Sequence, residues 1–277
     1  MVGLSLYSVI PVRSEASETA EQITQILFGE TFVILEQKPR WNRVKLHLDG
    51  QEGWIDAKMC TPMNAEEAKT YREAYEQSTA RVVFPLAYAV SENNGQTIPL
   101  TAGTKLTNYK DGRFEVLKVG FRIDPSMVAE KPFEMNEENL QHAVRFFLNV
   151  PYLWGGKNAL GMDCSGFTQV IMSLFGKSLK RNASEQVTQG RKIASLKSAQ
   201  AGDLVFFDHK DGKISHVGII LSPLNSKPST LNCTVVHCSG RVKVEKLDGT
   251  GIFNAETGTY SHHLAAIRRI DSKPSIP

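Results

Sequence analysis

The chain has 277 residues, of which 41% are hydrophobic and 22% charged, a composition typical of globular proteins and unlike that of disordered ones. Its 32 basic and 29 acidic residues are dispersed without a basic run, so the sequence lacks the charge pattern of a nucleic-acid-binding protein. No apolar stretch approaches the roughly 18 residues of a transmembrane helix, so we expect no membrane span.

The first part of the chain is predicted to form short strands. Four segments rich in β-branched and apolar residues are separated by turn residues: Leu4–Val12, Glu30–Gln37, Arg43–Leu48 and Gly53–Ile55. The pattern favours a small β-barrel over residues 1–63. Trp41 and Trp54 either belong to the core of this barrel or contact a ligand, and the sequence leaves both interpretations open.

The next two segments are predicted to be a helix and a second small barrel. Residues 64–79 are rich in Ala and Glu and begin with Asn64, a residue type that caps helices, so we expect a short connecting helix. Residues 80–130 return to strand-like segments with turns between them. We interpret them as a second, more divergent barrel that ends in a linker at Pro125–Pro132.

Residues 131–277 are predicted to form an α+β domain. Asn136 can cap a first helix, and Asn182 with Glu185 three residues later has the pattern of a capping box at the start of another. Strand-like segments then follow: Leu204–Phe207, His216–Leu221, Cys233–Cys238, Val242–Glu245 and Leu264–Arg268. Helices first and antiparallel strands afterwards indicate an α+β fold.

A cysteine in this domain lies between a glycine-rich loop and a periodic helix. The loop is Tyr152–Gly156, and apolar residues recur at helical spacing after Phe167. Cys164 therefore falls in the first turn of the helix, where unpaired N–H groups and the positive end of the helix dipole stabilise an anion. We expect the pKa of this thiol to be lowered and the thiolate to be a nucleophile.

Two histidines are placed to assist this cysteine. A thiol nucleophile needs a base, and His216 begins a strand that we expect in the central sheet. His237 lies near the end of the next strand, so antiparallel pairing would bring it beside His216 and allow it to orient the ring. The sequence predicts Cys164 as nucleophile, His216 as base and His237 as the orienting residue.

The sequence does not predict a metal site or another cofactor. Four residues are of types that bind zinc: Cys233, Cys238, His209 and His237. The two cysteines are five positions apart on one expected strand and so point to opposite faces, and no Cys-x-x-Cys or His-Glu-x-x-His pair occurs. We interpret His262 and His263 as surface residues that precede the last strand.

Five sequence blocks in the second half match, in order, those of one enzyme family: Pro151–Gly156, Asp163–Phe167, Ala201–Phe207, His216–Ile219 and Val236–Ser239. With these blocks, residues 136–270 resemble the NlpC-type cysteine peptidases that cut bacterial cell-wall peptides. The resemblance implies a papain-like domain with helices packed on an antiparallel sheet, the catalytic roles given above, and Tyr152 at the oxyanion site. Ala201 replaces the proline that is usual in the family, a change in a turn that should not affect the chemistry.

The first segment resembles bacterial SH3-like domains, on the basis of a strand that ends in Val12-Arg13 and a closing Gly53-Trp54-Ile55. Two such domains ahead of an NlpC-type domain are similar to a narrower group, the γ-D-glutamyl-L-diamino-acid endopeptidases of murein-peptide recycling, also called dipeptidyl-peptidase VI. Members of that group release L-Ala-γ-D-Glu from peptides with a free amino-terminal L-Ala. The resemblance therefore implies a murein tripeptide or longer stem peptide as substrate.

The same resemblance implies roles for four more residues. Asp163 would pair with the ammonium group of the substrate, which suits a carboxylate beside the nucleophile. Ser165 and Trp154 would line the dipeptide subsites, while the first SH3-like domain closes one side of the cleft and its Glu21 reaches the substrate. Gln51 replaces the aromatic residue that often makes a second contact from this domain. Asp163 is also a favoured helix N-cap, a role compatible with substrate binding.

We therefore expect a monomeric thiol peptidase that releases L-Ala-γ-D-Glu from murein peptides. The alternatives are a hydrolase of intact peptidoglycan, a non-catalytic wall-binding protein that keeps the fold, and an acyltransferase. The sequence leaves open whether the diamino acid is lysine or diaminopimelate. We expect a cytoplasmic protein, with a periplasmic or secreted protein as the alternative if an export signal was removed.

Overall fold

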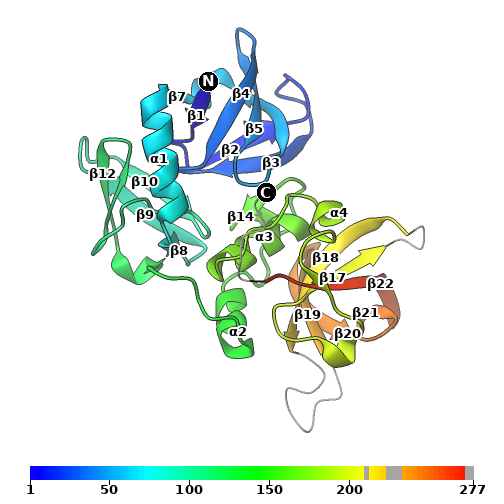
Figure 1. The fold of residues 1–277 in the computed structure, drawn as a ribbon. Coiled ribbons are helices and arrows are strands. Elements are labelled where there is room, and N and C mark those ends of the chain that lie inside the picture. Colours follow the sequence, from blue (N-terminus) through cyan, green and yellow to red (C-terminus); the bar gives the residue numbers. More distant parts are fainter. Residues whose placement is uncertain (209–211, 223–232, 272–277) are drawn as a thin grey trace. The chain divides into compact units, whose positions relative to one another are not determined.

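A computed structural model of the chain describes residues 1–208, 212–222 and 233–271. It is rich in strands and divides into two compact units (Figure 1). The first unit comprises residues 1–132 and 154–159, and the second comprises residues 133–153 and 160–277. A short segment of the predicted catalytic domain, Trp154–Ala159, thus belongs to the first unit.

The first unit begins with a seven-stranded antiparallel sheet in the order β3-β2-β6-β5-β4-β1-β7. Its strands are β1 (Val2–Leu4), β2 (Val9–Arg13), β3 (Gln22–Leu27), β4 (Thr31–Gln37), β5 (Trp41–Leu46), β6 (Glu52–Asp56) and β7 (Thr61–Met63), and the short helix η1 (Ala57–Met59) precedes β7. The aliphatic core includes Ile10, Val44 and Ile55. Trp41 and Trp54 are only half-buried, and Lys38 Nζ lies 4.3 Å from the centre of the Trp54 ring.

The predicted single strand Leu4–Val12 is wrong, because the chain turns between β1 and β2. The Ser5 hydroxyl is buried and donates a hydrogen bond to the Tyr7 carbonyl at 3.0 Å, and the Ser5 backbone N–H donates to Glu30. Serine side chains that bond the local backbone favour turns over strands. The remaining predicted strands of this segment are present within one or two residues of their expected ends.

Helix α1 (Ala65–Gln77) follows, and its predicted start at Asn64 is confirmed. Asn64 Oδ1 accepts a hydrogen bond from the Glu67 N–H at 2.9 Å, while the Glu67 carboxylate accepts one from the Asn64 N–H at 3.1 Å. These two bonds form a capping box. Tyr71 of α1 is buried in a core that contains Phe28 of the first segment and Phe114 of the next one. The regions predicted as separate domains therefore share one hydrophobic core.

The rest of the first unit contains a four-stranded sheet in the order β10-β9-β12-β11 and a separate strand pair, β8 with β13. The elements are β8 (Arg81–Val82), β9 (Leu86–Ser91), β10 (Thr97–Thr101), β11 (Arg113–Val116), β12 (Val119–Ile123), η2 (Pro125–Met127) and β13 (Val128–Ala129), with β14 (Lys157–Asn158) in the segment contributed by residues 154–159. The predicted linker Pro125–Pro132 is wrong in part, because it contains η2 and a strand that pairs with β8. A second SH3-like domain here remains a prediction.

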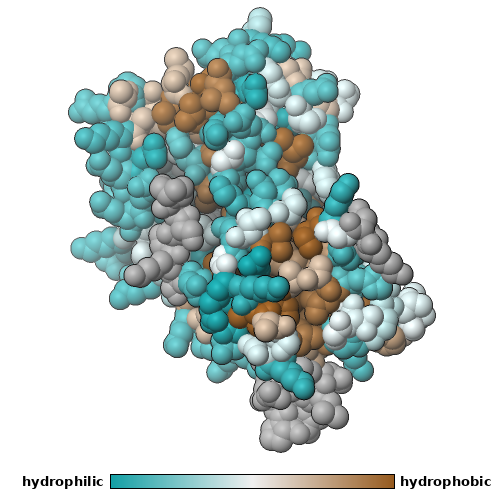
Figure 2. Space-filling view, turned by 45° about the vertical axis from the view of Figure 1, so that its right-hand side comes forward, coloured by the Kyte–Doolittle hydropathy of each residue, from teal (hydrophilic) through white to brown (hydrophobic). Residues whose placement is uncertain are grey.

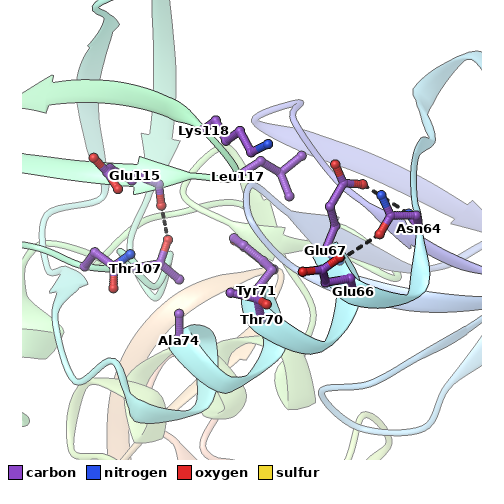
Figure 3. A pocket seen from close by; sticks show the side chains of 11 residues that line it. Asn64, Glu66, Glu67, Thr70, Tyr71, Ala74, Thr107, Glu115, Leu117 and Lys118 are labelled. Atoms are coloured by element: carbon purple, nitrogen blue, oxygen red, sulfur yellow. Dashed lines mark hydrogen bonds between the residues drawn. The ribbon is translucent and has the colours of Figure 1, made fainter.

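A hollow of about 360 Å³ lies beside α1 in the first unit (Figure 3). Its lining includes three carboxylates, those of Glu66, Glu67 and Glu115, and the ammonium group of Lys118. The dashed lines in Figure 3 show that Glu67 already bonds Asn64. None of the predicted catalytic residues lines this hollow.

The second unit is built around a seven-stranded antiparallel sheet in the order β16-β22-β17-β18-β19-β20-β21, and β21 also pairs with β22 (Figure 1). Its elements are α2 (Glu137–Arg145), β15 (Gly161–Met162), α3 (Cys164–Leu174), α4 (Ala183–Gln186), β16 (Arg191–Lys192), η3 (Leu196–Ser198), β17 (Leu204–Asp208), β18 (Ile214–Ser222), β19 (Cys233–Ser239), β20 (Arg241–Leu247), β21 (Gly251–Asn254) and β22 (Thr259–Arg269). Helices α2, α3 and α4 all contact β18. The predicted caps at Asn136 and at Asn182–Glu185 are confirmed, whereas β16 and β21 were not predicted.

The surface combines hydrophilic and apolar areas. On the face shown in Figure 2, teal hydrophilic residues cover most of the surface and brown apolar residues gather in separate areas. In the second unit the exposed large apolar side chains include Tyr152, Leu153 and Leu160, all close in sequence to Cys164. Among the residues that the structure describes, no helix has the length and apolar character needed to cross a membrane.

Candidate active site

Cys164 is the first residue of α3, as the sequence predicts. The Asp163 side chain caps the helix by accepting a hydrogen bond from the Gly166 N–H at 2.7 Å. The backbone N–H groups of Ser165 and of Val217 in β18 act on the Cys164 thiol by lowering its pKa. The thiol thus lies where the start of α3 meets β18, with only 7% of the residue exposed.

The predicted lowering of the thiol pKa is wrong. Burial, and to a smaller extent the negative charge of Asp163, raise the pKa of Cys164 to about 11. The N–H groups of Val217 and Ser165 and the charge of Arg181 act in the opposite direction but do not outweigh these effects. Burial wins because an ion loses hydration when it leaves water. Cys164 is therefore a neutral thiol near pH 7 until a base removes its proton.

His216 and His237 lie side by side, as predicted from their strands. His216 is in β18, next to Val217, whose N–H lowers the pKa of the Cys164 thiol. In the pairing of β18 with β19, His237 lies opposite Gly218, and His216 Nε2 is 2.8 Å from His237 Nδ1. Both rings are buried. The structure thus joins the two predicted histidines by a hydrogen bond on the strand that contacts the thiol.

Glu245 extends this hydrogen-bonded chain, and the sequence analysis did not single it out. His237 Nε2 is 2.8 Å from Glu245 Oε2, and Lys243 Nζ is 3.0 Å from the same oxygen. Burial lowers the pKa of His237, although Glu245 opposes the effect. Burial alone would raise the pKa of Glu245, but hydrogen bonds from His237 and Lys243 hold it below its usual range. The chain therefore ends in a carboxylate.

His262 also belongs to this cluster, and its interpretation as a surface residue before the last strand is wrong. Strand β22 begins at Thr259 and so includes both His262 and His263. The His262 ring stacks on His216, with 4.2 Å between ring centres and 29° between planes. Pairing of His262 with Ile252 of β21, a strand that the sequence analysis missed, holds it in the sheet.

Tyr152 lies near the thiol and is partly open to solvent. Its N–H donates to the Gly240 carbonyl at 2.9 Å, and 36% of the residue is exposed. Burial raises the pKa of Tyr152, and the charges of Cys164 and Asp163 raise it further. The phenol is therefore protonated at neutral pH and can donate a hydrogen bond.

Asp163 and Ser165 form a buried cluster with Arg181, a residue that the sequence analysis missed. Arg181 is 1% exposed, and its two terminal nitrogens lie 3.0 Å and 2.5 Å from the two Asp163 oxygens. Arg181 also donates to the Ser165 hydroxyl at 2.9 Å, and that hydroxyl donates to Asp163 at 3.2 Å. A substrate ammonium group would therefore have to share the Asp163 carboxylate with Arg181.

The other two predicted binding residues, Trp154 and Glu21, lie together in the first unit. Trp154 Nε1 donates to Glu21 Oε1 at 2.5 Å, and the Gln22 side chain donates to the Trp154 carbonyl at 3.1 Å. In the same segment, Lys157 Nζ lies 3.0 Å from Glu30 Oε1 in a buried ion pair. Burial raises the pKa of Glu30, with Lys157 opposing the shift. These bonds explain why Trp154–Ala159 belongs to the first unit.

The other two cysteines of the second unit, Cys233 and Cys238, are buried and have no predicted catalytic role. Cys233 is buried in the core of the sheet, and burial raises its pKa to about 12. Cys238 donates to the Met162 carbonyl at 3.2 Å. Within residues 1–208, 212–222 and 233–271, no group of three or more His, Cys, Asp or Glu residues is arranged to hold a metal ion. His209 lies outside the described residues.

Comparison with known proteins gives two family matches. Residues 149–263 match the NlpC/P60 family, and residues 8–59 match the bacterial SH3 domain. The first match includes Tyr152, Cys164, His216 and His237, and the second includes Glu21. The predicted site residues therefore fall inside the two matched regions.

Two curated relatives carry the same name. The chain is 30% identical over 210 residues to a γ-D-glutamyl-L-lysine dipeptidyl-peptidase of Bacillus subtilis, covering 71% of this chain and 68% of the relative. It is 25% identical over 221 residues to the protein of that name from Bacillus cereus, covering 73% of this chain and 65% of the relative. The chain thus spans about two thirds of the length of each relative.

Solved structures show a similar fold. The crystal structure of an NlpC/P60 family protein from Bacillus cereus matches with a TM-score of 0.76 and 18% identity, over 97% of this chain and 99% of that chain. An NlpC/P60 endopeptidase from Photobacterium damselae matches with a TM-score of 0.70 and 15% identity, over 96% of this chain and 70% of that chain. At these identities the likeness supports the fold alone.

Proposed function

Since the chain belongs to the NlpC/P60 family of cell-wall cysteine peptidases, we propose that it hydrolyses the bond between γ-D-glutamate and the L-diamino acid of murein peptides, releasing L-Ala-γ-D-Glu. The observation that carries this proposal is the placement of Cys164 at a helix start against β18, with the His216–His237 hydrogen bond of 2.8 Å on that strand. This arrangement combines a nucleophile, a base and an orienting residue.

In the first step, Cys164 attacks the γ-carbonyl carbon of D-glutamate. Because the thiol pKa is raised to about 11, its proton has to leave as the bond forms. His216 Nε2 is bonded to His237, and we assign Nδ1 as the nitrogen that takes this proton. The sulfur lone pair forms the C–S bond, and the carbonyl π electrons move to oxygen. His216 becomes an imidazolium.

The oxyanion needs hydrogen-bond donors that are in place before the reaction. Tyr152 keeps its phenolic proton because its pKa is raised, so its hydroxyl can donate to the oxyanion, as can N–H groups at the start of α3. When the oxyanion collapses, the C–N bond breaks and His216 gives its proton to the departing amine. Water then attacks the thioester, with His216 as base, and the Cys164 thiol is restored. No cofactor takes part in these steps.

The dipeptide specificity rests on the carboxylates available for the substrate's free ammonium group. Asp163 is already paired with Arg181, whereas the hydrogen-bond partner of Glu21 is the neutral indole of Trp154. Asp163 and Glu21 both stay candidates for this role, and Trp154 lies beside Glu21. The relatives named dipeptidyl-peptidase support an enzyme that recognises a free amino terminus.

Mass spectrometry of a tripeptide digest tests the proposal. We expect L-Ala-γ-D-Glu-L-lysine or the diaminopimelate tripeptide to give L-Ala-γ-D-Glu and the free diamino acid. Cys164→Ala should abolish the reaction, and the control Cys60→Ala, at a half-buried thiol of the first unit, should not. Equal cleavage of the N-acetylated tripeptide would rule out recognition of the ammonium group.

Hydrolysis of intact peptidoglycan is a second candidate, because residues 8–59 match the bacterial SH3 domain. Release of soluble fragments from purified sacculi, without activity on the free tripeptide, would favour it. A non-catalytic wall-binding protein would cleave neither substrate, and its Cys164 would not react with iodoacetamide. An acyltransferase would form ligated product when an amine acceptor is added to the digest.

A further inference from the structure

We propose that Glu245 is a positioning residue that fixes which ring nitrogens of His237 and His216 carry protons. The inference deepens the proposed function, since it concerns how His216 becomes the base for Cys164. It rests on an unbroken hydrogen-bonded chain in the second unit, with 2.8 Å between His216 and His237 and 2.8 Å between His237 and Glu245.

The carboxylate sets the tautomer of the first ring. Lys243 Nζ lies 3.0 Å from Glu245 Oε2 in an ion pair, so the carboxylate is ionised and this oxygen has no proton to donate. His237 Nε2, at 2.8 Å from the same oxygen, must then be the N–H donor. In the alternative tautomer, the Nε2 lone pair would face a carboxylate oxygen, and two acceptors cannot form a hydrogen bond.

The tautomer of His237 sets that of His216. A buried neutral imidazole has one donor nitrogen and one acceptor nitrogen, so a proton on Nε2 leaves His237 Nδ1 as acceptor. His216 Nε2 faces that nitrogen and must therefore be the donor. His216 Nδ1 then carries the lone pair that can take the Cys164 proton.

The sheet register keeps Glu245 in this place. In the pairing of β19 with β20, Lys243 lies opposite His237 and Glu245 lies opposite Val235. Residues 243 and 245 share a face, so the Glu245 side chain reaches His237 along the diagonal of the antiparallel pair. The Glu245 side chain is 12% exposed, which limits competition from water for the His237 N–H.

Two other groups of the same cluster lie against the rings. The charge of Lys243 on β20 lowers the pKa of His237, and the His262 ring on β22 stacks on His216 with 4.2 Å between ring centres. Neither of them is the acceptor for His237 Nε2. That acceptor is Glu245, so the tautomer assignment depends on it.

Nitrogen-15 chemical shifts of the histidine rings test the assignment directly in the full, unmodified chain, at a pH where the rings are neutral. We expect the shifts of a protonated Nε2 in both His237 and His216 and of an unprotonated Nδ1 in both. A protonated Nδ1 on either ring would overturn the proposal. This measurement needs no substrate, so it can succeed or fail independently of the proposed peptidase activity.

Two substitutions add a kinetic test. Glu245→Ala removes the acceptor, and we expect kcat to fall about 10- to 100-fold, the range found when carboxylate partners that orient metal-binding histidines are removed. KM should be nearly unchanged, and His216 should show a mixture of tautomers. Glu245→Gln can still present an oxygen to His237 and Lys243, so it should keep the wild-type tautomer and most of kcat.

The matched control is Glu256→Ala, which removes an exposed carboxylate near the end of β21. It should leave kcat, KM and the ring shifts unchanged, and circular dichroism should show all variants folded. Loss of kcat in Glu245→Ala with unchanged ring shifts would overturn the positioning role. So would an equal loss in Glu245→Gln, because the carboxylate charge and not the acceptor would then be responsible.

Discussion

Replacement of Arg181 by methionine should destabilise the second unit more than any surface substitution in it. Methionine fills a similar volume but leaves the Asp163 carboxylate buried without its charged partner. Arg181 is 1% exposed and bonds both Asp163 oxygens, at 3.0 Å and 2.5 Å, and the Ser165 hydroxyl at 2.9 Å. The pair is therefore in the class in which loss of one partner costs about 3–5 kcal/mol.

Urea unfolding followed by circular dichroism measures this loss as a change in the free energy of unfolding. By thermal unfolding, 3–5 kcal/mol corresponds to a decrease in Tm of roughly 6–20 °C for a unit of this size. The control is Arg191→Met, because Arg191 Nε lies 3.6 Å from Asp271 and both side chains are more than half exposed, at 55% and 64%. An exposed pair of this kind contributes about 0–1 kcal/mol.

The double variant Arg181→Met, Asp163→Asn shows whether the unpaired, buried Asp163 carboxylate causes the loss of stability. Asparagine still caps a helix but carries no charge, so the double variant should be more stable than Arg181→Met alone. If the double variant is equally unstable or worse, lost packing explains the effect and the electrostatic reasoning fails. Arg181 also lowers the Cys164 pKa, so alkylation of Arg181→Met by iodoacetamide should shift to higher pH.

Three further predictions follow from buried or aligned polar groups. Burial lowers the pKa of His237 in the folded state below the 6.5 of the unfolded chain. Between the folded and the unfolded pKa, the folded state therefore binds fewer protons than the unfolded state. The free energy of unfolding measured in urea should therefore fall as the pH drops below about 6.5, and a fall that persists in His237→Gln would contradict this assignment. Lys157→Met strands the buried Glu30 carboxylate and should cost about 3–5 kcal/mol in the first unit; a loss under about 1 kcal/mol would mean that Glu30 simply takes up a proton. Tyr152→Phe should lower kcat about 100- to 1,000-fold with an unchanged thiol alkylation rate, while near-wild-type kcat would remove Tyr152 from the oxyanion site.

The helix starts and strands that were correctly predicted depend on interactions between residues close together in the sequence. The capping boxes at Asn64 and Asn182 and the helix start at Asp163 involve partners within three residues, and all are confirmed. Runs of β-branched and apolar residues likewise predict β17, β18 and β19, and the pairing of β18 with β19 brings His216 and His237 together. Local hydrogen bonding and strand periodicity were sufficient for these features.

Two of the three missed residues, Arg181 and His262, have partners far apart in the chain, whereas Glu245 lies eight residues after its partner His237. Arg181 lies 18 residues after Asp163, and nothing in its local sequence shows that it is buried against that carboxylate. Glu245 could have been found from the tight hairpin at Gly240, since pairing of Ser239 with Arg241 fixes the register of both strands. His262 reaches His216 through the pairing of β22 with β17 and of β17 with β18, and β22 lies far from the other two strands in the sequence.

The sequence by itself determined the nucleophile, its two histidines and the order of the elements that carry them, because these depend on motifs and local periodicity. The tertiary structure alone decided the ionisation of the nucleophile. The helix start at Cys164 predicts a lowered pKa, but burial and the nearby Asp163 raise it to about 11. Desolvation depends on everything packed around the thiol, so this effect appears only when the whole unit has folded.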